Sequence, residues 1–294
     1  MDNYQSQLLL NRHRRAVRYP GFLGGRISGG NGSSKLQVQG GVGDCALFDF
    51  TSGLFAVSDG SDRDPSASRH FMLMFSKILK QLMRAPAGTI FSSAEISAIK
   101  EILAAESERL LCSMPFGAGC TFTGVLLLRM AEGVASIVMH TGDSLLINCD
   151  LSNSEACQFT RDNFWLVGRS QRFFQIEMLP VSCSTRLVLA TDGLRGLSFP
   201  AAPDRDKYFI DLLKKYGPEE IPDMILIDDG PPAPGRDDAS LIVINPFALV
   251  YLPHCVMLGG TDLHEESLFK EERSRGVMAD KYAPVSSSDK FLTV

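Results

Sequence analysis

The feature that most constrains this chain is an apolar run that stops abruptly at an Asp-Gly pair, RLVLATDGL at residues 186–194. The stretch from Leu187 to Thr191 is apolar or β-branched, which suits a buried strand, and Gly193 permits a sharp exit from it. Asp192 is therefore expected to present a carboxylate at the end of a buried strand.

The same pattern recurs along the chain. LFAVSDG (54–60) ends in an Asp-Gly pair, and VASIVMHTGDS (134–144) runs into a Gly-Asp turn, whereas in CALF (45–48) and ASLIVIN (239–245) the carboxylate comes before the strand. In an antiparallel sheet, the end of one strand lies beside the start of its neighbour. We therefore expect five carboxylates to gather at one edge: Asp44, Asp59, Asp143, Asp192 and Asp237.

A gathering of carboxylates favours a metal site. Like charges a few Å apart repel one another, and divalent cations would supply the missing counter-charge. No His or Cys falls at these five positions. A ligand set made only of oxygen atoms suits Mg²⁺ or Mn²⁺ better than Zn²⁺ or copper.

Composition and charge exclude several classes of protein. With 294 residues and evenly spread apolar side chains, the sequence predicts one main domain, and a net charge of −5 gives no reason to expect a nucleic-acid partner. The most apolar stretch, 241–258, is interrupted by Asn and Pro residues, so no membrane span is expected. Seven cysteines without a C-x-x-C pair indicate a reducing compartment, and we expect a cytoplasmic protein.

The predicted elements come in blocks. A hairpin over 45–58 is followed by helices over about 65–84 and 92–112, where Ser92 and Glu95 form a capping box. Strands follow near 119–129, 134–140, 144–149, 157–160, 174–178 and 185–191, then a helix near 204–216 and a strand over 239–245. Strand runs interrupted by helix blocks predict antiparallel sheets with helices on their outer faces.

The ends of the chain are expected to lie outside this domain. Residues 1–34 are basic and then rich in glycine, which predicts an irregular N-terminal arm before a domain at 35–250. Residues 251–294 are rich in charge and predict a C-terminal extension or tail, through which a regulatory partner could bind.

Taken in order, the motifs resemble those of the PP2C-type metal-dependent protein serine/threonine phosphatases, nearer to their bacterial branch. The resemblance covers roughly residues 35–246 and rests on GDCALF (43–48), VSDG (57–60), GCTFTGVLL (119–127), TGDSLLI (141–147), FTRDN (159–163), LATDGL (189–194) and DDASLIVI (237–244). Asp-Gly pairs are common in turns, so the ordered series carries more weight than any one fragment.

The resemblance implies an α+β fold, a four-layer α-β-β-α sandwich, with two metal ions between the sheet ends. Asp59 would bridge both metals, with the Gly60 carbonyl completing one shell, and Asp192 and Asp237 would hold the other metal. Asp44 would bind directly or through water, and Asp143 looks like the ligand of a third metal.

The activity implied by the resemblance is metal-dependent hydrolysis of phosphoserine or phosphothreonine in proteins. Water held by two Mg²⁺ or Mn²⁺ ions has a lowered pKa and can attack phosphorus without a protein nucleophile. Two alternatives stay open. The first is a pseudophosphatase that acts as a binding module, which departures from the family pattern at Gly43 and at residues 61–64 would suit. The second is a phosphatase of small phosphorylated molecules.

A phosphatase also needs a cation near the metals to bind phosphate. Arg63 is nearest in sequence to Asp59, while Arg26, Lys35 and Arg236 could reach in from loops. Each is also readily explained as a solvated surface charge. His140 falls within a predicted strand, and we expect it to be structural.

Overall fold

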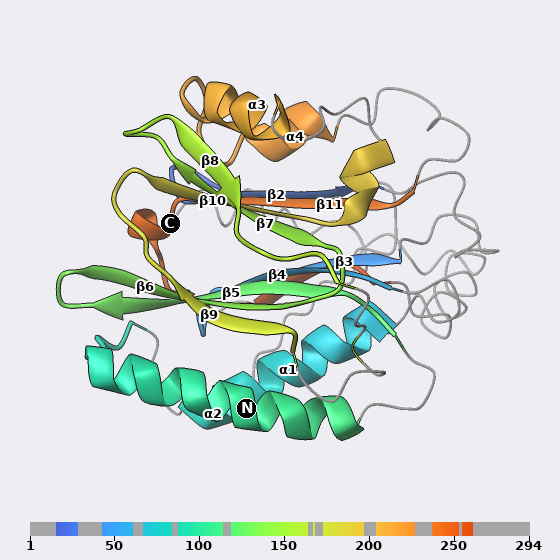
Figure 1. Ribbon diagram of the computed structural model, residues 1–294, viewed down its shortest axis with the longest axis vertical. Coiled ribbons are helices and arrows are strands. Elements are labelled where there is room, and N and C mark those ends of the chain that lie inside the picture. Colours follow the sequence, from blue (N-terminus) through green and yellow to red (C-terminus); the bar gives the residue numbers. More distant parts are fainter. Residues whose placement is uncertain are drawn as a thin grey trace, which may run out of the picture.

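Two six-stranded antiparallel sheets lie face to face, with helices on both outer faces (Figure 1). The computed structural model describes residues 16–28, 43–60, 67–83, 88–113, 119–163, 167, 173–196, 204–226, 237–252 and 255–260. These residues form four layers in the order helix, sheet, sheet, helix. The predicted α-β-β-α sandwich is confirmed.

The first sheet, sheet A, carries two of the predicted acidic strand ends. Its strands in spatial order are β1 (Ala16–Tyr19), β2 (Leu23–Ser28), β11 (Ala239–Ile244), β10 (Thr185–Ala190), β7 (Leu145–Asp150) and β8 (Glu155–Gln158). The 3-10 helix η1 (Asp192–Gly196) follows β10, and η2 (Pro246–Ala248) follows β11. Helices α3 (Asp204–Leu213) and α4 (Ile221–Ile225) cover its outer face (Figure 1).

The second sheet, sheet B, contains the hairpin predicted over residues 45–58. Its strands in spatial order are β12 (Cys255–Gly259), β3 (Asp44–Asp49), β4 (Leu54–Asp59), β5 (Phe122–Met130), β6 (Gly133–Thr141) and β9 (Gln175–Leu179). Helices α1 (Ala67–Met83) and α2 (Ser93–Ser113) cover its outer face (Figure 1). The elements predicted between residues 45 and 245 are present, with ends shifted by a few residues.

Each pair of neighbouring layers encloses its own apolar core. Between the sheets, Phe55 makes edge contacts with Phe22 and Phe50, so that side chains from both sheets interlock. Under α1, Phe71 and Phe122 pack edge to face. A third core lies between sheet A and helices α3 and α4. The alternation of apolar residues to both faces of each sheet explains why the central strands read as continuous hydrophobic runs.

The capping box at the start of α2 forms as predicted. The backbone N–H of Ser92 and its hydroxyl both donate to Oε2 of Glu95, at 2.7 Å each, and the Glu95 N–H donates back to the Ser92 hydroxyl at 3.3 Å. The bond from the Ser92 backbone lowers the pKa of Glu95. Reciprocal bonds of this kind satisfy N–H groups that a helix start leaves without partners.

The predicted irregular N-terminal arm is wrong for residues 16–28. β1 and β2 form a hairpin, and β2 pairs with β11 inside sheet A. The glycines that suggested a loop instead allow close packing, because a Cβ on Gly24 would lie 2.4 Å from the Pro218 carbonyl oxygen and one on Gly25 would lie 2.2 Å from the Phe48 ring. Residues 1–15 and 29–34 of the predicted arm lie outside the described residues.

The predicted C-terminal extension is also wrong for residues 255–259. These residues form β12, which pairs with β3 at the edge of sheet B. Residues 253–254 and 261–294 of the extension lie outside the described residues, as do the first residues of the helix predicted from about residue 65 and the phosphate-binding candidates Arg63, Lys35 and Arg236.

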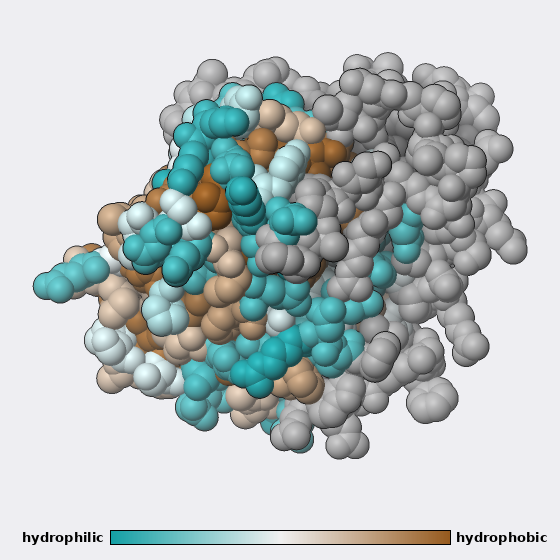
Figure 2. All heavy atoms as spheres, turned by 45° about the horizontal axis from the view of Figure 1, so that its top comes forward, coloured by the Kyte–Doolittle hydropathy of each residue, from teal (hydrophilic) through white to brown (hydrophobic). Residues whose placement is uncertain are grey.

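The surface in view in Figure 2 intersperses hydrophilic and hydrophobic side chains over its described part. Exposed large apolar residues among the described ones include Ile90, Tyr216 and Phe247. Scattered residues of this kind are normal on a globular domain. Among the described helices, none is long and apolar enough to cross a membrane. The six cysteines whose side chains are described are all free.

Replacing Gly24 by Ala tests whether β2 is an integral strand. The added methyl group would meet the backbone of Pro218 and Glu219, so we expect a loss of about 1–3 kcal/mol in the free energy of unfolding, measured with urea. Gly21→Asn is the control, because Gly21 has a φ of +69° with nothing near its Cβ position, and Asn tolerates such a φ. Equal, small losses in both variants would contradict the assignment.

Candidate functional site

Strand pairing brings the five predicted carboxylates to one end of the sandwich. Asp44 begins β3 and Asp59 ends β4, and the two are direct cross-strand partners. In sheet A, β10 leads into Asp192 and pairs with β11, which follows Asp237. Asp143 comes shortly before β7, which pairs with the same end of β10. The start of β3 and the 3-10 helix η1, which follows β10, lie at the same side of the molecule in Figure 1.

Asp44 joins the two sheets at this end. Its side chain is 1% exposed, and Oδ2 accepts hydrogen bonds from the hydroxyls of Thr191, at 2.6 Å, and Ser240, at 3.0 Å. The Ser240 N–H in turn donates to the Thr191 hydroxyl at 2.8 Å. A carboxylate of sheet B is thus held by two adjacent strands of sheet A. Asp44 is more deeply buried than the other four predicted carboxylate ligands, which are half-buried.

The Asp192 and Asp237 turns lie directly against each other. A Cβ on Gly193 would fall 1.6 Å from the backbone oxygen of Asp238, so only glycine permits this approach. The buried Asp238 carboxylate accepts the Gly43 N–H at 2.7 Å, which ties this turn to the start of β3. The Asp238 N–H donates to Oδ1 of Asp237 at 2.9 Å. Backbone packing therefore sets the positions of both carboxylates.

Thr121 connects the Asp59 and Asp143 turns. Its hydroxyl accepts the Asp59 N–H at 2.9 Å and lies 2.6 Å from the hydroxyl of Ser144. Its own N–H donates to the Asp59 carbonyl at 2.9 Å. Both hydroxyl-bearing side chains are buried.

Asn163 holds the Asp143 turn from the other side. Its Oδ1 accepts the Gly142 N–H at 3.0 Å, and its own N–H donates to the Gly142 carbonyl at 2.9 Å. His140 lies beneath, with Nδ1 2.8 Å from the Thr123 hydroxyl and Nε2 3.1 Å from the Arg161 carbonyl. A neutral ring with its proton on Nε2 satisfies both contacts. The expectation that His140 is structural agrees with this environment.

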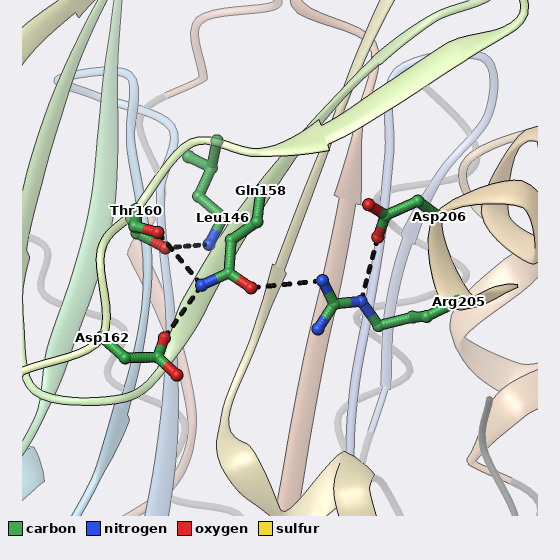
Figure 3. Close-up of polar contacts among 6 residues, drawn as sticks. All are labelled: Leu146, Gln158, Thr160, Asp162, Arg205 and Asp206. Carbon is green, nitrogen blue, oxygen red and sulfur yellow. Dashed lines mark hydrogen bonds and ion pairs between the residues drawn. The ribbon is translucent and has the colours of Figure 1, made fainter. Parts of the chain in front are cut away.

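The segment that carries Asn163 is tied to helix α3 by the polar network in Figure 3. Arg205, at the start of α3, donates to Gln158 Oε1 at 3.2 Å and to Asp206 at 3.1 Å. Gln158 Nε2 then donates to the Thr160 carbonyl at 3.0 Å and to Asp162 at 2.8 Å. The side chain of Arg205 is 11% exposed, whereas Asp162 at the other end of the network is exposed, so only the α3 end is shielded from water.

The predicted ligands fit a hard divalent cation in kind. The groups that the turns present are carboxylates and backbone carbonyls, the oxygen donors that Mg²⁺ and Mn²⁺ prefer. Within the described part of the chain, however, no three His, Cys, Asp or Glu side chains lie close enough together to hold a metal ion. The described residues thus supply suitable donors at one edge without forming a complete ligand cluster.

Several solved bacterial structures are similar in fold to this chain. A bacterial serine phosphatase matches with a TM-score of 0.53 at 14% identity, over 75% of this chain and 96% of that one. PppA, described as a key regulatory component of T6SS in Pseudomonas aeruginosa, matches with a TM-score of 0.51 at 18% identity, over 76% and 98%. The S. agalactiae serine/threonine phosphatase also gives 0.51, at 16% identity, over 76% and 99%.

This chain has the PP2C-type phosphatase fold. At 14–18% identity the likeness concerns the fold. No protein-family model matches the sequence, and no curated protein matches it significantly. The fold therefore agrees with the one expected from the ordered motifs. The roles of individual residues are predictions.

One predicted phosphate-binding residue, Arg26, forms an ion pair with helix α4. Arg26 belongs to β2, and its guanidinium donates to Asp223 of α4 at 2.6 Å. Both side chains are 18% exposed. In this PP2C-type fold, Arg26 therefore joins α4 to sheet A.

Sequence reasoning missed the residues that support the acidic turns. Thr121, Ser144, Asn163 and Thr191 all lie inside the motifs that suggested the fold, yet none was assigned a role. Ser144, Asn163 and Thr191 each stand next to an Asp in the sequence, which was a possible signal, whereas Thr121 does not. Their partners are far away in sequence, for example 147 residues between Thr191 and Asp44, so the contacts could not be read from local spacing.

We predict that Thr191→Val destabilises the protein by about 1–3 kcal/mol, because the buried Asp44 carboxylate loses a hydroxyl donor and the Ser240 N–H loses its acceptor. Urea unfolding at neutral pH measures the effect. Thr191→Ser keeps the hydroxyl and should stay close to the wild type. Equal free energies of unfolding for Thr191→Val and Thr191→Ser would show that the Thr191 hydroxyl does not help to hold the two sheets together.

Burial lowers the pKa of His140 to about 4, although the nearby Arg161 carbonyl and Asp162 favour its charged form. An unfolded His has a pKa near 6.5, so between these values the unfolded chain binds the extra proton and the folded protein loses stability as the pH falls. Relative to His140→Gln, the wild type should lose about 2 kcal/mol of unfolding free energy between about pH 7.5 and pH 5. A constant difference between the two proteins would contradict a buried neutral ring.

Proposed function

We propose that this protein is a metal-dependent phosphatase that hydrolyses phosphoserine and phosphothreonine in proteins. The observation that carries the proposal is the set of half-buried carboxylates gathered at one edge of a fold shared with bacterial serine/threonine phosphatases. Repulsion among such groups makes a cationic partner favourable there.

Asp59, Asp192 and Asp237, with the Gly60 carbonyl, would hold two Mg²⁺ or Mn²⁺ ions, and Asp44 and Asp143 would complete the set. When bound, such ions lower the pKa of water and neutralise charge on phosphoryl oxygens. The chain's own contribution is to fix the donors. The Asp59 backbone is bonded on both sides to Thr121, and the Gly193 turn is packed against Asp238.

Two observations favour a second candidate, a pseudophosphatase that binds partners without turnover. The described residues do not form a three-ligand cluster, and position 43, beside Asp44, is glycine. In that case the fold would serve as a binding module and the carboxylate edge would be a remnant.

The deciding experiment is hydrolysis of a phosphothreonine peptide and of an aryl phosphate by the purified protein with Mn²⁺, with Mg²⁺ and with EDTA. We expect turnover that requires metal and ranks the peptide above the ester. Asp192→Asn should lower turnover by more than about 100-fold, beyond the range seen when a residue merely supports a ligand. Asp211→Asn, an exposed position on α3, is the matched control and should stay active.

Each other outcome is informative. Turnover in EDTA, or an active Asp192→Asn variant, would reject the metal-dependent mechanism. A preference for the small ester would point to a phosphatase of small molecules. No turnover with intact binding of Mn²⁺ would support the pseudophosphatase.

A further inference from the structure

Thr121 lies between the turn that carries Asp59 and the turn that carries Asp143. It immediately precedes β5, is 3% exposed, and makes two backbone-directed bonds to Asp59. The Asp59 N–H donates to its hydroxyl at 2.9 Å, and its N–H donates to the Asp59 carbonyl at 2.9 Å. The backbone of Asp59 is thus held on both sides by one residue.

The same hydroxyl oxygen contacts the Asp143 turn. It lies 2.6 Å from the hydroxyl of Ser144, which is fully buried and directly follows Asp143. Gly142, on the other side of Asp143, has a φ of +101°, and a Cβ there would lie 2.7 Å from the Thr121 Cβ. The turn therefore rests on the Thr121 side chain.

The bonds at this oxygen are mutually compatible. A hydroxyl offers one donor and two acceptor sites, so it can accept the Asp59 N–H and still bond Ser144 in either direction. Loss of the hydroxyl would leave the buried Ser144 hydroxyl and the part-buried Asp59 N–H without that partner, which is unfavourable. The positions of the two acidic turns are consequently linked through a single atom.

We infer that Thr121 is a positioning residue that couples Asp59 to Asp143, so that metal binding at one turn depends on the geometry of the other. The inference deepens the proposed function and rests on it, because both carboxylates are proposed metal ligands. Residues that support ligands in this way change metal affinity by about 10–100-fold when they are lost.

The test compares Thr121→Val, which keeps the shape but removes the hydroxyl, with Thr121→Ser, which keeps the hydroxyl. Thr185→Val is the matched control. Thr185 is 4% exposed and its hydroxyl accepts a backbone N–H, from Ser182 at 2.8 Å, but it lies at the opposite end of β10 from Asp192. Each protein is titrated with Mn²⁺ by calorimetry and by electron paramagnetic resonance, with thermal unfolding recorded in parallel.

We expect Thr121→Val to bind Mn²⁺ about 10–100-fold more weakly, with a matching rise in the Mn²⁺ concentration for half-maximal turnover. Thr121→Ser should restore binding to near the wild-type value, and Thr185→Val should leave it unchanged. Wild-type affinity in Thr121→Val, or an equal loss in Thr185→Val, would overturn the inference.

Ser144→Ala cuts the same link from the other turn and serves if Thr121→Val fails to fold. Weaker Mn²⁺ binding in this variant supports the coupling, and unchanged binding overturns it. A wild-type protein that binds Mn²⁺ but shows no turnover would reject the proposed function alone, because the binding comparison still judges Thr121. A wild-type protein that binds no Mn²⁺ would overturn both.

Discussion

The hydrogen bonds of the buried Asp44 carboxylate to Thr191 and Ser240 are the interaction on which the acidic edge depends. They tie the first strand of the sheet B hairpin to the two strands of sheet A that carry Asp192 and Asp237. A buried carboxylate is stable only when it is well paired, so this contact constrains how the sheets can be placed. The apolar core between the sheets supplies the driving force, and the polar contact joins the sheets at the acidic edge.

Hydrogen bonds to the backbone and close backbone packing hold the turns that carry the predicted metal ligands. The Asp59 backbone bonds to Thr121, the Gly142 backbone bonds to Asn163, and Gly193 packs on the Asp238 carbonyl. Support of this kind holds carboxylates in place despite their mutual repulsion. It also means that substitutions at uncharged residues can alter the site as much as changes at the carboxylates.

Much of the fold could be predicted from the sequence. Hydrophobic runs, the capping box at Ser92 and the hairpin over residues 45–58 are local signals, and each matches an element of the structure. The two errors, at residues 16–28 and 255–259, concern edge and near-edge strands. The β2 sequence LGGRIS resembles a loop, because its glycines are selected by close contact with Pro218 and Phe48, which are distant in the chain.

The sequence by itself determined the strand ends that carry Asp44, Asp59, Asp143, Asp192 and Asp237, because strand period and Asp-Gly turns are properties of a few neighbouring residues. Only the tertiary structure decided that Asp44 is buried between the sheets, that Thr121 bonds to two acidic turns, and that Arg26 pairs with Asp223. These outcomes depend on which strands become neighbours and how the sheets face each other. Such long-range pairings follow from packing of the whole domain, which local spacing does not encode.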